Sequence, residues 1–320
     1  MKVSGIKAVV TGGAGFIGSH LVDRLLALGN KVLVIDDLRG GSEDFIRHNY
    51  KNKDFKFVKE DLLNYKGLET LIKGYDVVYH LAANPDVKAG ASNTTIDLEQ
   101  NVLVTHRVLE AMRLAGVPNI VFTSTSTVYG EAKEIPTPED YGPNIPISMY
   151  AASKIGAEGL ICAYCHTFGM KAVIYRFANC VGSRSTHGVT FDFVNKLRKD
   201  PKTLQILGDG KQKKSYFHVS DCIDAMIFGA EHQKQTVEVF NVGSEDYIDV
   251  TTLAKVVVDV MGLKGVKLEY TGGTKSGAGW VGDVKVMMLG IEALKALGWK
   301  PKYTSAESIK LTAESLVKGK

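Results

Sequence analysis

Tyr150 and Lys154 lie four residues apart in the run Met149-Tyr150-Ala151-Ala152-Ser153-Lys154, which opens a segment typical of a helix. In a helix this spacing places both side chains on one face. A free tyrosine has a pKa of about 10, which is too high for a base at neutral pH. A nearby lysine ammonium favours the phenolate and lowers that pKa, so the pair predicts a tyrosine that acts as a general base.

A cluster of hydroxyl side chains precedes this pair. It follows the apolar run Ile120–Thr123, which is typical of a strand, and reads Thr123-Ser124-Thr125-Ser126-Thr127. Hydroxyls at the C-terminal end of a parallel strand are well placed to donate to a substrate oxygen. The alternative is a turn whose hydroxyls bond to their own backbone.

A glycine-rich turn near the start of the chain predicts a nucleotide site. The run Thr11–His20 lies between the apolar residues Ala8–Val10 and the amphipathic run Leu21–Leu28, an order that predicts strand, tight turn and helix. Glycines in such a turn let backbone amides approach a pyrophosphate, and a later glycine lets the helix pack closely on the strand. The residues concerned are Gly12, Gly15, Phe16, Ile17 and Gly18.

A second strand-like run, Lys31–Ile35, ends in Asp36-Asp37. A carboxylate at this strand end accepts hydrogen bonds from both ribose hydroxyls of an adenosine. It would repel a 2′-phosphate, so the sequence favours NAD over NADP as the cofactor.

Apolar strand-like runs alternate with helix-period runs through the first half of the chain. This alternation predicts a Rossmann-like, doubly wound parallel sheet with helices on both faces. We expect an NAD-binding domain over residues 1–175 and a smaller α/β nucleotide-sugar-binding domain over 176–320, with some segments returning to the first domain. The further predicted strands are Phe55–Val58, Val77–His80, Lys171–Tyr175 and the candidate Val239–Val242.

Bulk composition excludes several classes of protein. The chain has 320 residues, of which 45% are hydrophobic and 23% charged, and its net charge is +4. This slight positive charge suits an anionic small substrate, and no basic stripe indicates nucleic acid. No run reaches transmembrane length, and four scattered cysteines favour a reducing cytoplasm. Cys162-x-x-Cys165 falls within the predicted helix Ile155–Phe168, so we expect buried thiols and no metal.

The motifs together resemble a known superfamily. The glycine spacing, the hydroxyl cluster and Y-x-x-x-K resemble the short-chain dehydrogenase/reductase superfamily, and T-G-G-A-G-F-I-G-S-H resembles its extended branch. S-T-S-T-V-Y-G, Y-A-A-S-K and the runs 207–221 and 279–284 are similar to UDP-glucose 4-epimerases, especially archaeal-type members. The resemblance covers essentially the whole chain.

The resemblance implies roles for residues by position. Tyr150 is the base, Lys154 tunes it and holds the nicotinamide ribose, and Thr125, with Ser124 beside it, shares the proton route. Asp61 and Leu62 contact the adenine, while His80 is structural. Further implied cofactor contacts are Leu81, Ala82, Ala83, Asn101 and Thr123; implied substrate contacts are Asn84, Thr125, Tyr150, Asn179, Val189, Lys214 and Asp283.

The implied activity is NAD-dependent 4-epimerisation of UDP-glucose and UDP-galactose through a transient 4-keto sugar. Two departures bear on the substrate. Lys214 stands where many epimerases carry an arginine to the diphosphate, and lysine lacks the bidentate fork. The arginine usual before the late G-D pair is also absent, with Ala278 or Trp280 there, and Met287 falls at the position that gates N-acetylated sugars.

Alternatives stay open on the sequence alone. An epimerase or decarboxylase of another nucleotide sugar is one, since Lys88 or Arg184 could face a sugar carboxylate. A 4,6-dehydratase is disfavoured because Ser126 and Thr127 replace its aspartate and glutamate. A net-redox dehydrogenase or a non-catalytic NAD-binding protein would share the fold. The superfamily's dimers imply a homodimer through the predicted helix Ile96–Arg113 and the helix after Tyr150.

Overall fold

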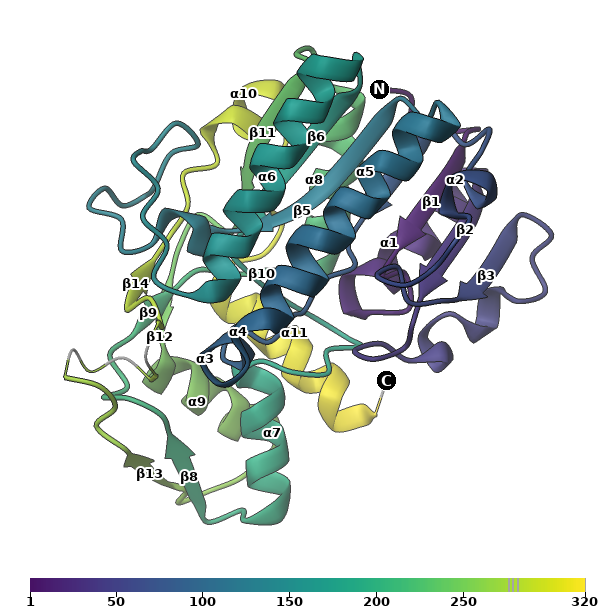
Figure 1. The fold of residues 1–320 in the computed structure, drawn as a ribbon. Helices are drawn as coiled ribbons and strands as arrows, with labels where there is room; N and C mark the ends of the chain where they lie inside the picture. Colours follow the sequence, from purple (N-terminus) through teal and green to yellow (C-terminus); the bar gives the residue numbers. More distant parts are fainter. Residues whose placement is uncertain (276, 278, 281, 320) are drawn as a thin grey trace. The chain divides into compact units, whose positions relative to one another are not determined.

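The computed structural model describes residues 1–275, 277, 279, 280 and 282–319 (Figure 1). The chain forms two compact units. Unit 1 comprises Met1–Val128, Ser148–Arg176 and Ile223–Phe240, and unit 2 comprises Tyr129–Ile147, Phe177–Cys222 and Asn241–Lys320. The functional division expected near residue 175 stays a prediction.

A seven-stranded sheet in the order β3-β2-β1-β4-β5-β6-β11 confirms the doubly wound fold. The order reverses at β1, so the ends of β1 and β4 flank the topological switch point where such folds bind ligands. The inner strands are buried on both faces, as expected for parallel strands covered by helices. The strands are β1 (Lys7–Thr11), β2 (Lys31–Asp36), β3 (Phe55–Lys59), β4 (Val77–His80), β5 (Asn119–Thr125), β6 (Lys171–Phe177) and β11 (Val237–Val242).

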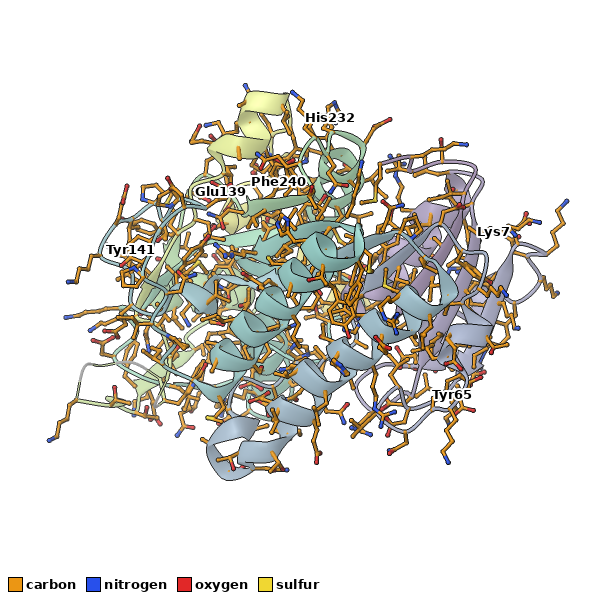
Figure 2. All side chains as sticks on the ribbon, turned by 45° about the horizontal axis from the view of Figure 1, so that its top comes forward. Lys7, Tyr65, Glu139, Tyr141, His232 and Phe240 are labelled. Carbon is orange, nitrogen blue, oxygen red and sulfur yellow. The ribbon has the colours of Figure 1, made fainter. Side chains whose placement is uncertain are left out.

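Helices cover both faces of this sheet. On one face lie α2 (Leu68–Leu71), α5 (Val104–Ala115) and α6 (Met149–Phe168), and on the other α1 (Phe16–Ala27) and α8 (Val219–Glu231) (Figure 1). An ion pair of 3.9 Å between Arg24 and Asp224 links α1 to α8. At the sheet edge, the ring of Phe240 stacks on Tyr175 with centroids 5.9 Å apart (Phe240 is labelled in Figure 2).

The helix expected over Ile96–Arg113 is interrupted. The chain forms α4 (Thr94–Asp97), then a π-helical segment, η3 (Leu98–Leu103), and only then α5. A π-turn contains an extra residue and so rotates the side chains before it relative to those after it. Leu98 is therefore 50% exposed while Leu109 and Met112 are fully buried. An uninterrupted α-helix would place all three on one face.

Unit 2 contains small sheets and helices around its own core. β7 (Asn179–Val181) pairs in parallel with β10 (Tyr216–His218), and β9 (Lys213–Lys214) lies between β12 (Ile248–Asp249) and β14 (Val286–Met287). The remaining elements are α7 (Val189–Lys199), β8 (Thr203–Ile206), α9 (Val250–Val260), β13 (Lys267–Tyr270), α10 (Glu292–Leu297) and α11 (Ser305–Lys318). Across the described ranges, none of the helices has the length and apolarity that a membrane span requires.

Candidate active site

The glycine turn of unit 1 is a cradle that side chains would fill. Gly12 has a φ of +70°, and a Cβ there would lie 2.7 Å from the backbone nitrogen of Ala82. A Cβ on Gly18 would lie 2.1 Å from the carbonyl oxygen of Gly12. Gly15 caps α1 without a side-chain hydrogen bond, so no side chain caps the first amides of α1, those of Phe16 and Ile17 included. This geometry fits close approach of a pyrophosphate.

The carboxylates expected to hold the adenosine lie at the ends of β2 and β3. Asp36 accepts hydrogen bonds from the amides of Ala14 (2.9 Å) and Leu38 (2.8 Å). Burial raises its pKa, and these two bonds oppose the rise. Asp37 and Asp61 share Arg39, at 3.2 and 3.6 Å, so β2 and β3 present a linked carboxylate pair. Leu62, beside Asp61, is buried.

His80 is a buried structural link, as expected. Its Nδ1 lies 2.7 Å from the Thr11 hydroxyl and its Nε2 lies 3.1 Å from the Thr105 hydroxyl. Burial, aided by the charge of Lys154, lowers its pKa to about 3, so the ring stays neutral. The backbone amides of Leu81 and Ala82 bond to Thr11, which holds the His80–Ala83 turn against the glycine turn.

The structure brings Tyr150, Lys154 and Thr125 together at the end of β5. Ser148 caps α6 by accepting the amide of Ala151 at 3.1 Å, which starts the helix one residue before Tyr150. The Lys154 Nζ donates to the carbonyl oxygen of Thr123 at 2.9 Å and lies 5.9 Å from the Tyr150 ring centroid. The Thr125 hydroxyl lies near enough to Tyr150 to influence its pKa.

The pKa of Tyr150 differs from the expectation. Burial and the charge of Asp97 raise it to about 12, and the Thr125 hydroxyl only partly opposes them. Burial lowers the pKa of Lys154 to about 8, against the charges of Glu158 and Asp97. The predicted lowering of the Tyr150 pKa by Lys154 is therefore wrong for the chain alone, because desolvation of the phenolate dominates.

An amide network joins the loop after β4 to α6. Asn101, in the π-segment, accepts the Asn84 amide at 2.9 Å and donates to the Ser153 hydroxyl at 2.8 Å. Both asparagines also donate to Oδ1 of Asp97, a fully buried carboxylate whose pKa is raised by burial. Asp97 was not predicted from sequence; its only signal was a charge four residues before Asn101.

Ser124 has a different partner from the one expected. Its hydroxyl donates to Glu158 at 2.5 Å, and Glu158 also pairs with Arg176. Successive side chains of a strand point to opposite faces, so Ser124 and its neighbour Thr125 cannot both face Tyr150. Glu158 and Arg176 were also missed, although Glu158 repeats the four-residue spacing after Lys154.

The residues expected to hold the nucleotide lie in unit 2. Asn179 donates to the Ser215 carbonyl at 3.1 Å, and Lys214 pairs with Asp283 at 2.5 Å. The Lys214 Nζ lies 5.3 Å from the Trp280 ring centroid, so Trp280 occupies the neighbourhood of that cation. Val189 begins α7 and Met287 is buried in β14; Ala278 lies outside the described residues.

Metal-ligating groups do not gather anywhere in the part of the chain that the structure describes. Cys162 and Cys165 are free thiols on α6, and burial raises the pKa of both. A raised pKa disfavours the thiolate that metal binding and redox exchange need.

Known proteins resemble this chain over nearly its full length. Residues 8–243 match the model of the NAD dependent epimerase/dehydratase family. A putative UDP-glucose 4-epimerase of Methanocaldococcus jannaschii is 33% identical over 94% of this chain and 95% of its own length. A crystal structure of UDP-galactose 4-epimerase is 40% identical, with a TM-score of 0.87, over 98% of this chain and 99% of that one.

The resemblance extends to enzymes acting on a different sugar. The UDP-glucuronic acid 4-epimerase of Bacillus cereus, solved with UDP-glucuronic acid and NAD, is 29% identical, with a TM-score of 0.89, over 98% of this chain and 100% of that one. UDP-glucuronic acid decarboxylases are also among the relatives.

Proposed function

The chain belongs to the NAD dependent epimerase/dehydratase family, and we propose that it interconverts UDP-galactose and UDP-glucose by inverting carbon 4 of the sugar. Its relatives are nucleotide-sugar epimerases and decarboxylases, and NAD is the cofactor. The glycine cradle of Gly12 and Gly18 and the carboxylate of Asp36 fit that cofactor. The single observation that carries the proposal is the grouping of Tyr150 and Thr125 beside Lys154, whose Nζ lies 5.9 Å from the Tyr150 ring centroid.

In this proposal Tyr150 and Thr125 transfer the proton of the sugar's 4-hydroxyl group. NAD, when bound, would supply the hydride acceptor and donor for carbon 4, and its oxidised nicotinamide would add a positive charge. Tyr150, directly or through Thr125, removes the proton of the 4-hydroxyl and gives it back after the keto sugar has turned. A positive charge near Tyr150 favours the phenolate, which is how a group with a pKa of about 12 in the chain alone acts as a base. Lys154 holds the nicotinamide ribose.

Unit 2 is proposed to hold the nucleotide. Asn179 and Lys214 contact the diphosphate, Asp283 the uridine ribose, and Val189 the substrate beside them. Lys214 is already paired with Asp283, so a diphosphate competes with a carboxylate for this ammonium. A lysine binds phosphate as a point charge rather than as a fork, which lowers the selectivity of the contact.

A second candidate substrate is UDP-glucuronate, favoured by relatives that act on this sugar. The test is to incubate the purified protein, without added NAD, with UDP-galactose and separately with UDP-glucuronate. Formation of UDP-glucose from UDP-galactose supports the first proposal. Turnover of UDP-glucuronate alone, to its epimer or with release of carbon dioxide, replaces it with the second.

We also propose a homodimer through the π-segment, α5 and α6 of unit 1. These elements expose large apolar side chains to solvent: Leu98, Leu103, Leu114 and Phe168 are 43–58% exposed. Leu103 and Leu114 also line a shallow pocket of about 460 Å³, with Leu62 and His106. Such exposed apolar surface is typical of a protein interface.

A further inference from the structure

Three side chains that the proposed chemistry does not use form a hydrogen-bonded cluster in unit 1. Glu158 Oε1 accepts the Ser124 hydroxyl at 2.5 Å and Arg176 Nε at 3.1 Å, and its Oε2 accepts Arg176 Nη2 at 2.7 Å. The Glu158 and Arg176 side chains are each 10% exposed. This Glu158 cluster joins the end of β5, the middle of α6 and the end of β6.

The cluster fixes a buried negative charge in one position. A bidentate arginine–carboxylate pair has a defined geometry, and the serine hydroxyl adds a third donor. Removing one partner from such a buried pair is costly, because the other charge is left uncompensated. The Glu158 carboxylate is therefore held still, and it lies one helical turn after Lys154, on the same side of α6.

Lys154 is the cation next to this charge. It is 3% exposed, and its ammonium donates to the Thr123 carbonyl, with the Phe122 ring centroid 4.7 Å away. Burial therefore favours its neutral form. The charges of Glu158, on α6, and of Asp97, on α4, oppose that effect.

The other titratable groups around Lys154 do not supply this charge. His80, on β4, is neutral because burial lowers its pKa to about 3. Tyr150, on α6, is protonated in the chain alone. Arg176, on β6, is a cation and is bound to Glu158. Asp97 raises the pKa of Tyr150 as well, whereas Glu158 is not among the groups that shift it.

We propose that Glu158 is a positioning residue: its buried carboxylate keeps the Lys154 ammonium charged and fixes the end of β5 that carries Thr125. The role of Ser124 is then to donate a hydrogen bond to Glu158, and it does not contact the substrate. This inference rests on the proposed function only for the use of Tyr150 and Lys154, and not on the identity of the sugar.

Lysines labelled with ¹³C at Cε allow the proposal to be tested by NMR without substrate. Burial lowers the pKa of Lys154 to about 8 in the chain alone, so we expect its signal, assigned by its loss in Lys154→Arg, to titrate in the range that NMR can follow. In Glu158→Gln we expect the midpoint to move about one pH unit lower, since a nearby charge is lost. Glu158→Asp, which keeps the charge, restores most of the midpoint. An unchanged Lys154 midpoint in Glu158→Gln overturns the proposal, whatever happens to turnover.

The matched control is Glu269→Gln, which removes an exposed carboxylate paired with Lys267 at 2.7 Å in unit 2 and leaves the Lys154 midpoint unchanged. Glu158→Gln removes a buried ion pair and can prevent folding, so Ser124→Ala provides a second arm. We expect Ser124→Ala to lose less than the hundredfold that a general base contributes, and less than Thr125→Ala. A loss in Ser124→Ala as large as in Tyr150→Phe overturns the assignment of Ser124 to Glu158.

Discussion

The Nζ atom of Lys154 lies 2.9 Å from the carbonyl oxygen of Thr123, which ties α6 to the end of β5. Thr125 follows two residues later on the same strand, and Tyr150 lies one turn before Lys154 on the same helix. This hydrogen bond therefore fixes the helix that carries Tyr150 against the strand that carries Thr125. Rigid elements position such groups more precisely than loops do.

Tyr150→Phe removes only the hydroxyl that the account uses as acid and base. We expect turnover of UDP-galactose to fall on the order of a hundredfold or more, the usual scale of a general base, while UDP binding measured by calorimetry is retained. Tyr50→Phe, at an exposed tyrosine stacked on Phe55, is the matched control and keeps full turnover. Near-native turnover in Tyr150→Phe would remove Tyr150 from the reaction.

Gly12→Ala tests the cofactor cradle. Its Cβ would lie 2.7 Å from Ala82, in addition to the strain of φ +70°, so we expect loss of copurified NAD and a lower Tm. Gly116→Ala shares that φ but meets nothing within 4 Å, so it reports the backbone strain alone, about 1 kcal/mol. Equal effects of the two substitutions, with NAD retained in both, would contradict the cradle.

The low pKa of the buried His80 predicts that the folded chain loses stability in acid. Its pKa is about 3 in the folded chain and about 6.5 unfolded, so the unfolded chain binds the extra proton between these values. Stability is therefore complete above about pH 6.5 and decreases as the pH falls, by roughly 3 kcal/mol at pH 4. We expect His80→Asn to flatten the dependence of Tm on pH in this range, and the exposed His187→Asn to leave it unchanged. If the Tm of His80→Asn falls with pH as steeply as that of the native chain, other groups cause the loss of stability in acid.

The proposed dimer is tested by sedimentation equilibrium. We expect a mass of twice 34.8 kDa for the native chain and a shift toward 34.8 kDa in Leu103→Glu, which places a charge on the exposed apolar surface. Tyr50→Glu, at an exposed aromatic outside that surface, should not change the mass. A native chain that sediments as a monomer contradicts the proposal.

The strands and the glycine turn were predictable because their signals are local. Apolar runs bounded by glycines and carboxylates locate β1, β2 and β4, and the spacing of Tyr150 and Lys154 puts both on α6. The π-segment was not predictable, since Leu98–Leu103 also fits an α-helical period. The effect of its extra residue is seen only in the structure, where Leu98 is exposed and Leu109 is buried.

The Glu158 cluster and Asp97 depend on contacts between residues distant in sequence. Glu158 meets Ser124, 34 positions earlier, and Arg176, 18 positions later. Asp97 meets Asn84 across the β4 loop. A buried charge is stable only with such partners. Because the sequence does not reveal these partners, it suggests that Glu158 and Asp97 are ordinary solvent-exposed carboxylates. The pairing of Lys214 with Asp283 was not predicted for the same reason, since the two residues are 69 positions apart.

Turnover of UDP-galactose carrying deuterium on carbon 4 tests the central claim most directly. If the chain keeps NAD bound and returns the same hydride after Tyr150 has taken the proton, the UDP-glucose formed in ordinary water retains the deuterium on carbon 4. Mass spectrometry and NMR of the product measure this retention. Replacement of the deuterium by solvent hydrogen would contradict epimerisation by oxidation and re-reduction at carbon 4.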